Sequence, residues 1–340
     1  MFHFYHILAV LVFTIGGTKA QGGGTTAAGD SYVCVPAGYC ANGGTPTSPG
    51  IDPRIVTPGN EPCPAGQIPC YTQGPSSRCG ERLVSPVSTA DGQATDGAHP
   101  WQAYIRNSTN PVYAGSGVLI DNYHILTAAH KVYGDRGNPA AVSVLMGVTN
   151  PANLATAQVR TAAQITIHSN YDPATLKNDI AIITVSDPFN LSGNINSLCL
   201  PAANGGAESA GAYIGQTCVV AGWGETSFQI ADEPTNPMKQ VNINPIGIAA
   251  CRAGLLPVLP TVDTYLDQNG GEICAGGQQD KDACTYDGGA PLTCPNTGKG
   301  TMVGLVIWGK GCGQANVYGV YVSVPYYRGW IDTAITQLNG

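Results

Sequence analysis

The chain has 340 residues and a formal net charge of −7, and only 11% of its residues are charged. An average soluble domain is about a quarter charged. Only 15 lysines and arginines are present, and they form no cluster. Because neutralising phosphates requires grouped basic side chains, this composition excludes a nucleic-acid surface. Hydrophobic residues at 43% suffice for a core.

Residues 1–20 read as a secretory signal peptide. The apolar run at 6–16 (HILAVLVFTIG) is too short for a membrane span. Small residues, Thr18 and Ala20, precede the expected cleavage site after Ala20. No later apolar run reaches membrane-spanning length. We therefore expect a secreted, extracellular protein without a membrane partner.

Secretion predicts two kinds of covalent modification. The chain contains 12 cysteines, and an even number in an oxidising compartment implies disulfides. Asn107 begins an Asn-x-Thr triplet and Asn190 an Asn-x-Ser triplet, which makes both candidate N-glycosylation sites.

Residues 21–75 are expected to contain a disordered lead-in followed by a small module. The lead-in at 21–30 (QGGGTTAAGD) has few hydrophobic residues. The stretch at 31–75 is rich in Gly, Pro and Thr and shows almost no apolar periodicity. So short a segment cannot bury a sufficient core, so disulfides must stabilise it. Residues 76–97 read as a linker.

Residues 98–340 have the pattern of an all-β domain, in which short apolar strands alternate with Gly, Asn and Pro turns. We predict strands at 101–106, 115–120, 141–148, 159–168, 179–185, 217–223, 240–246, 301–308 and 319–324. The last segment differs, because its apolar residues fall at helical spacing and predict an amphipathic C-terminal helix. These residues are Trp330, Ile331, Ala334, Ile335 and Leu338.

Three motifs of this domain carry candidate chemistry: LTAAHKV with His130, KNDIAIITV with Asp179, and DACTYDGGAPLTC at 282–294. Taken alone, each is explained by a structural histidine, a cap or a turn. Together they resemble the chymotrypsin-like (trypsin-type) serine proteases, with support from HPWQ, SLCLP, VAGWG, EICAGG, WGKGCG and YGVYVSV. The resemblance covers about residues 80–340. It implies two six-stranded antiparallel β-barrels with a cleft between them and a C-terminal helix.

The resemblance also shows what is missing. Acyl transfer needs a hydroxyl nucleophile, a histidine base, an orienting carboxylate and backbone N–H donors for the oxyanion. His130 and Asp179 match the base and its orienting residue. The family motif GDSGGP reads YDGGAP at 286–291, so Gly288 takes the place of the nucleophile and Tyr286 that of the oxyanion-hole glycine. A tyrosine there makes the required backbone conformation costly. The prediction is therefore that the protein is not an enzyme.

The activation sequence of the family is also absent. Its new amino-terminal Ile would fall at Ser88, preceded by Val87 instead of a basic residue. Asp287, which would pair with that terminus, needs another partner or lies near solvent. Thr285 lies too far from position 288 to replace the nucleophile. Other cleavage points remain at Arg54, Arg78 and Arg82.

The substrate pocket of trypsin-type members is retained. Asp282 matches the carboxylate at its base, and Gly309 and Gly319 match the glycines that leave it open. A basic side chain could therefore dock there. The alternative, equally favoured, is that Asp282 is a hydrogen-bonded buried carboxylate without a ligand. His130 and Asp179 are interpreted as a retained structural pair.

The resemblance implies four disulfides in the linker and body. The bridge that family members usually have beside the histidine is absent from this chain, because its two cysteine positions are occupied by Gly115 and Lys131. The four pairs are Cys79–Cys199, Cys218–Cys294, Cys251–Cys274 and Cys284–Cys312. The remaining cysteines, in CVPAGYC and CPAGQIPC, resemble a reduced clip domain of arthropod serine protease homologues. If one whole disulfide has been lost, the pairs Cys34–Cys63 and Cys40–Cys70 remain.

We expect no metal and no cofactor. The chain has no C-x-x-C pair, no Asp or Glu between Asp135 and Asp172, and no phosphate-binding or dinucleotide motif. The hypothesis is a secreted, inactive homologue that acts by binding. The resemblance suggests a cofactor or regulator of an immune proteolytic cascade of the prophenoloxidase-activation and melanisation type, with clip proteases or phenoloxidase-type proteins as partners. The alternatives are a decoy, adhesion, reproductive or venom protein, and, third, a residual serine endopeptidase.

Overall fold

The computed structural model describes residues 23–25, 31–36, 67–71, 78–85, 87–109, 112–202, 210–225 and 237–338. The chain divides into two compact units, Met1–Gly74 and Pro75–Gly340. The signal peptide and the pairs Cys34–Cys63 and Cys40–Cys70 lie outside what is described, because only backbone is described at Cys34 and Cys70.

The first unit contains an antiparallel three-stranded sheet in the order β1-β2-β3. Its strands are β1 (Gly23–Thr25), β2 (Ser31–Pro36) and β3 (Gln67–Tyr71). β1 falls within residues 21–30, for which the sequence predicts disorder; its backbone pairs with β2 instead. β2 and β3 are far apart in sequence, and their register places Val33 opposite Cys70.

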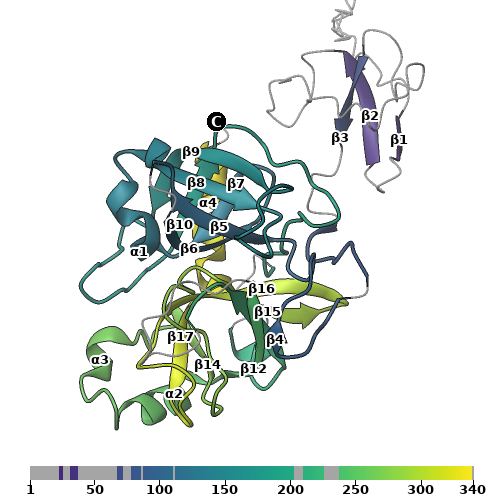
Figure 1. Ribbon diagram of the computed structural model, residues 1–340. Coiled ribbons are helices and arrows are strands. Elements are labelled where there is room, and N and C mark those ends of the chain that lie inside the picture. Colours follow the sequence, from purple (N-terminus) through teal and green to yellow (C-terminus); the bar gives the residue numbers. More distant parts are fainter. Residues whose placement is uncertain are drawn as a thin grey trace, which may run out of the picture. The chain divides into compact units, whose positions relative to one another are not determined.

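In the second unit, six antiparallel strands close a barrel in the order β10-β7-β6-β5-β8-β9 (Figure 1). They are β5 (Gln102–Asn107), β6 (Tyr113–Leu119), β7 (His124–Thr127), β8 (Val142–Met146), β9 (Gln158–Ile167) and β10 (Ala181–Val185). The continuous apolar run of β10 follows from burial on both faces: Ile183 belongs to the core inside the barrel and Ile182 to the core outside it.

The remaining strands form an eight-stranded sheet in the order β13-β14-β17-β16-β15-β11-β12-β4. They are β4 (Gly92–Gln93), β11 (Cys218–Gly222), β12 (Lys239–Ile243), β13 (Pro245–Ile246), β14 (Glu272–Gly276), β15 (Pro291–Asn296), β16 (Lys299–Trp308) and β17 (Tyr318–Ser323). β12 and β13 are consecutive, so the segment 239–246 pairs with β11 at one end of the series and with β14 at the other. This bent segment makes the sheet a second barrel, which confirms the predicted double-barrel fold.

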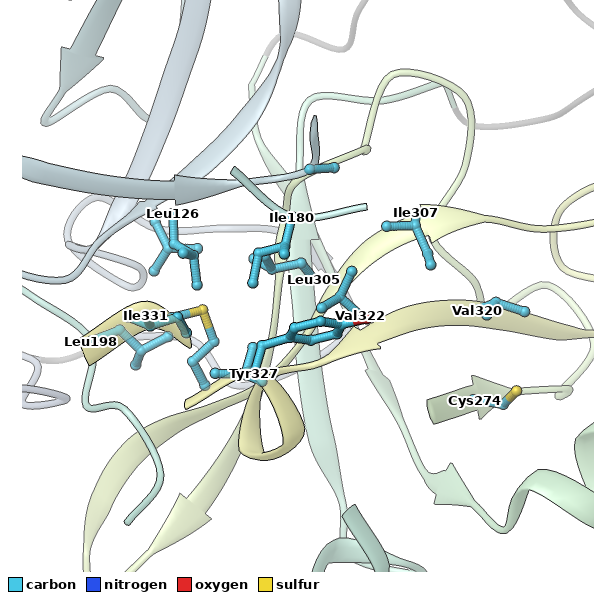
Figure 2. Packing of buried hydrophobic residues seen from close by; sticks show 14 of the residues in the cluster. Leu126, Ile180, Leu198, Cys274, Leu305, Ile307, Val320, Val322, Tyr327 and Ile331 are labelled. Atoms are coloured by element: carbon cyan, nitrogen blue, oxygen red, sulfur yellow. The ribbon is translucent and has the colours of Figure 1, made fainter. Parts of the chain in front are cut away.

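A shared apolar core joins the two barrels. Leu126 and Ile180 of the first barrel cluster with Leu305 and Val322 of the second (Figure 2). Helix α4 (Val324–Leu338) adds Ile331 to this cluster, as the apolar spacing of its sequence predicted. The shorter helices are α1 (Ala129–Val132), α2 (Ile248–Leu255) and α3 (Val262–Tyr265). Within the described residues, no helix combines the length and apolarity needed to cross a bilayer.

Disulfides fix the second unit at four places. The pairs are Cys79–Cys199, Cys218–Cys294, Cys251–Cys274 and Cys284–Cys312, which are the pairs that the resemblance implied. The first of them anchors the start of the linker, where the Gly80 N–H also donates to the Ser197 carbonyl at 2.8 Å.

Candidate functional site

The pairing of β7 with β10 brings His130 and Asp179 together. Thr127 at the end of β7 lies opposite Ala181 at the start of β10. His130 follows β7 in helix α1, and Asp179 precedes β10. The buried Asp179 accepts the backbone N–H of His130 at 2.7 Å and the imidazole Nδ1–H at 2.6 Å. These two bonds orient the ring, so that Nε2 is turned toward position 288.

Residue 288 is a glycine and has no side chain of its own to contact that imidazole. A Cβ atom built on Gly288 would lie 2.7 Å from Nε2 of His130. The carbonyl of Gly288 accepts the N–H of Ser116 at 3.0 Å, which fixes the loop against β6. The base and its orienting carboxylate are therefore in place, and the hydroxyl that would use them is missing.

Tyr286 keeps a left-handed backbone, with φ at +74°. This conformation is costly for a tyrosine, and strain of this kind costs about 1–3 kcal/mol. Two contacts of its ring offset part of that cost. The ring lies 6.4 Å from that of Tyr113, and the Lys131 ammonium is 5.9 Å from its centroid.

Lys131 fills the space that two glycines leave open. Its Cε is 2.3 Å from the Cβ position of Gly288, and its Cδ is 2.8 Å from that of Gly115. A side chain at either glycine would displace it. Burial lowers the pKa of the Lys131 amine, while the carboxylates of Asp287 and Asp179 act to raise it.

Asp287 is half-buried, and backbone groups of the chain are its hydrogen-bond partners in place of a new amino terminus. Its carboxylate accepts the N–H of Gly224 at 2.8 Å and that of Cys284 at 2.9 Å. Burial raises its pKa to about 6, while these two bonds and the charge of Lys131 act to lower it. A Cβ at Gly222 would lie 2.1 Å from the carboxylate, so a glycine is needed there.

The Asp282 pocket is open. His130, Asp282, Gly288, Trp308 and Gly319 are among the residues that line this cavity of about 210 Å³. Oδ2 of Asp282 accepts the N–H of Gly313 at 3.2 Å, whereas Oδ1 is buried without a hydrogen-bond partner. Burial raises the pKa of Asp282 to about 7, and backbone hydrogen bonds act to lower it.

Glycines leave space beside that carboxylate. A Cβ on Gly319 would approach Oδ1 of Asp282 to 3.0 Å, and one on Gly309 would come within 3.5 Å of the Gly311 carbonyl. The free Oδ1 can therefore accept a hydrogen bond from a cationic group that enters the pocket. No group of three or more His, Cys, Asp or Glu side chains in the described part of the chain could hold a metal ion.

The linker around Ser88 is held at the edge of the second barrel, a feature that the sequence did not reveal. The Gln240 amide donates to the carbonyls of Ser88 at 3.0 Å and Ala90 at 2.7 Å. His99 Nε2 lies 2.6 Å from the amide oxygen of Gln240 and thereby fixes its orientation. Burial lowers the pKa of His99 to about 4, so this imidazole is neutral at physiological pH. The motif HPWQ marks His99 in the sequence, but nothing there identifies Gln240 as its partner, because the two residues are far apart along the chain.

Comparison with known proteins agrees with this geometry. The trypsin family model matches residues 90–331. The chain is 34% identical to inactive CLIP domain-containing serine protease A3 of Aedes aegypti, over 92% of this chain and 69% of that protein. It is 30% identical to phenoloxidase-activating factor 2 of Galleria mellonella, over 73% and 84% of the two chains. It is 32% identical to protein masquerade of Drosophila melanogaster, over 78% of this chain and 24% of the other.

The double barrel and a site without a hydroxyl opposite its histidine define a class, the non-catalytic homologues of serine proteases. The chain belongs to the trypsin family and, within it, to the inactive serine protease homologues of the clip-domain type.

Proposed function

We propose that this protein is secreted and acts by binding, as a cofactor or regulator in an extracellular immune proteolytic cascade of the prophenoloxidase-activation and melanisation type. The observation that carries the proposal is Gly288, which leaves an oriented His130–Asp179 pair and an open pocket without the hydroxyl that would attack a peptide bond. The kind of cascade is supported by the names of the relatives, a phenoloxidase-activating factor and an inactive clip-domain protease. The partners would be clip proteases or phenoloxidase-type proteins.

The pocket gives a physical route to such binding. An arginine or lysine of a partner would place its charge against the free Oδ1 of Asp282. In an active protease the bound segment is then cut and released. Here the site lacks the hydroxyl nucleophile, so the segment stays intact and the complex persists for as long as its contacts allow.

The absence of catalysis is tested with a fluorophosphonate probe and an arginine ester substrate. The purified protein is incubated with each, before and after trypsin treatment, beside a His130→Ala variant. We expect no labelling and no turnover in any sample. Turnover that His130→Ala abolishes would establish a residual endopeptidase and overturn the proposal.

The pocket is tested by calorimetry with benzamidine, whose amidinium mimics an arginine. Because the pKa of Asp282 is about 7, affinity should fall as the pH is lowered below 7, approaching tenfold per unit. Asp282→Asn should abolish binding, whereas the exposed neighbour change Asp280→Asn should leave it unchanged. Equal affinity of the wild type and Asp282→Asn would show that the pocket is not used.

The partner is tested by capture from haemolymph on the immobilised protein. Recovery of a phenoloxidase or a clip protease, lost on addition of benzamidine, supports the cascade role and the pocket together. Recovery of neither, with expression confined to one gland and not induced by wounding or infection, would favour the decoy, adhesion, reproductive or venom role.

Secretion and glycosylation are part of the same proposal. Asn190 is exposed, whereas Asn107 is half-buried and its side-chain oxygen accepts both the N–H and the hydroxyl of Thr109. We expect the secreted protein to begin at Gln21 and to carry glycan on Asn190 first. N-terminal sequencing and glycopeptide mass spectrometry measure both.

A further inference from the structure

Lys131 is half-buried, and its amine has no direct partner. Within the described residues, its Nζ makes no hydrogen bond and no ion pair, in contrast to Lys281, which pairs with Asp91 at 2.7 Å, and Lys299, which pairs with Glu81 at 3.2 Å. The groups that face Lys131 are His130, the carboxylates of Asp179 and Asp287, and the ring of Tyr286.

The amine also lies in an open cavity beside a base. Lys131 and His130 both line the pocket that contains Asp282. Lys131 Cε and His130 Nε2 lie 2.3 Å and 2.7 Å from the same point, the Cβ position of Gly288. The Lys131 side chain therefore occupies the space beside Gly288 toward which Nε2 of His130 is oriented.

We infer that Lys131 is a nucleophilic amine that captures aldehydes entering this pocket. Burial disfavours its charged form, and only the neutral amine has the lone pair needed for attack. The ring nitrogen of His130 can take the proton that the ammonium loses. The site is independent of Asp282, because an uncharged aldehyde makes no ion pair with that carboxylate.

The reaction needs no oxidant or reductant. The nitrogen lone pair forms a bond to the carbonyl carbon, and the π electrons move to the carbonyl oxygen, which takes a proton. The resulting carbinolamine loses its hydroxyl group and the remaining nitrogen proton as water. The product is an imine in which the carbon of the aldehyde is doubly bonded to the nitrogen of Lys131.

The test uses benzaldehyde with cyanoborohydride, which reduces the imine to a stable benzylamine. The full-length protein is treated at pH 7, and the modified lysines are quantified by peptide mass spectrometry. We expect Lys131 to be labelled faster than the exposed Lys239 and Lys310, because burial favours its neutral amine. In concentrated urea the three rates should become equal, because the pocket is lost.

Two variants complete the test. Lys131→Arg keeps a cation beside Asp287 and should eliminate labelling at this position without affecting Lys239. His130→Gln should slow the labelling of Lys131 alone. Labelling of Lys131 no faster than that of Lys239 and Lys310 in the folded protein would overturn the inference. The proposed binding function would stand in that case, since benzaldehyde carries no charge for Asp282.

Discussion

Lys131 and Gly288 occupy one space: the alkyl chain of the lysine passes through the volume that a side chain at residue 288 would fill. The two residues are 157 positions apart in the printed sequence, yet neither can change size without affecting the other. Replacing the glycine with a nucleophile is therefore a problem of packing as well as of chemistry.

Gly288→Ser should destabilise the protein by about 1–3 kcal/mol, the usual cost of overpacking a filled site. Adding Lys131→Ala should recover most of that loss, because the serine then has room. Urea unfolding of the two single variants and the double variant measures the coupling between the residues.

Gly134→Ser is the matched control, because a Cβ at Gly134 meets nothing within 4 Å. Additive effects of the two substitutions at 131 and 288 would contradict the packing described here. We expect no protease activity even in the double variant, because Tyr286 keeps the place that the resemblance matches to the oxyanion-hole glycine, and residue 87 is Val instead of a basic residue.

Asp179→Ala should lower the free energy of unfolding by about 2–3 kcal/mol. The change leaves the backbone N–H and the imidazole Nδ1–H of His130 without their acceptor. A hydrogen bond to a charged group contributes about 1.5–3 kcal/mol to stability. Asp179→Asn retains an acceptor for the backbone N–H and should cost less.

Asp332→Ala serves as the control for Asp179→Ala. It removes the half-exposed partner of Arg328, a surface ion pair whose loss should cost under about 1 kcal/mol. Equal costs at both positions would show that the His130–Asp179 pair contributes nothing particular to the fold.

Asp282 should make the protein less stable as the pH rises from about 4 to about 7. Its pKa is raised from 3.8 to about 7, so in this window the folded state binds a proton that the unfolded state has lost, and stability falls with rising pH. His99, with its pKa lowered to about 4, acts in the opposite sense between about 4 and 6.5.

The variant Asp282→Asn separates the two effects, because His99 is present in both proteins. The free energy of unfolding of the variant minus that of the wild type should be larger at pH 8 than at pH 5. Thermal unfolding at the two values measures this difference, and a difference that does not change with pH would contradict the burial of an ionisable Asp282.

Gln240→Ala should free the linker around Ser88. The variant loses two hydrogen bonds to the linker backbone and leaves His99 without its partner. We expect subtilisin to cut within residues 87–91 several times faster than in the wild type. Peptide mass spectrometry locates the cut. The exposed change Gln164→Ala should have no effect, and an equal rate in Gln240→Ala would show that other contacts hold the segment.

Much of the second unit was predictable, because its strands have apolar faces and its motifs occur in a recognisable order. Four strands of this unit were missed for local reasons. β4 has only two residues and β7 only four, and β14 ends in Ala275 and Gly276, which weaken a strand pattern. β15 contains Pro291 and Pro295, which argue against a strand, but Pro291 is its first residue. β10 was predicted from Asp179 onward and begins at Ala181.

The site divides in the same way. His130, Asp179 and Asp282 follow from motifs, since each lies next to a recognisable run of sequence. The course of the Lys131 side chain does not, because it depends on the space left by Gly115 and Gly288, which only the folded chain brings together. The partners of Asp287 are likewise backbone groups, and no side-chain pattern in the sequence identifies them.

The disulfide between Cys79 and Cys199 makes the position of a proteolytic cut decisive. The eight cysteines of the second unit are paired with one another, so none is left to bridge to the first. A cut after Arg78 therefore severs the covalent connection between the two units. A cut after Arg82, four residues later, lies inside the loop that the disulfide closes and yields two chains that remain joined until they are reduced.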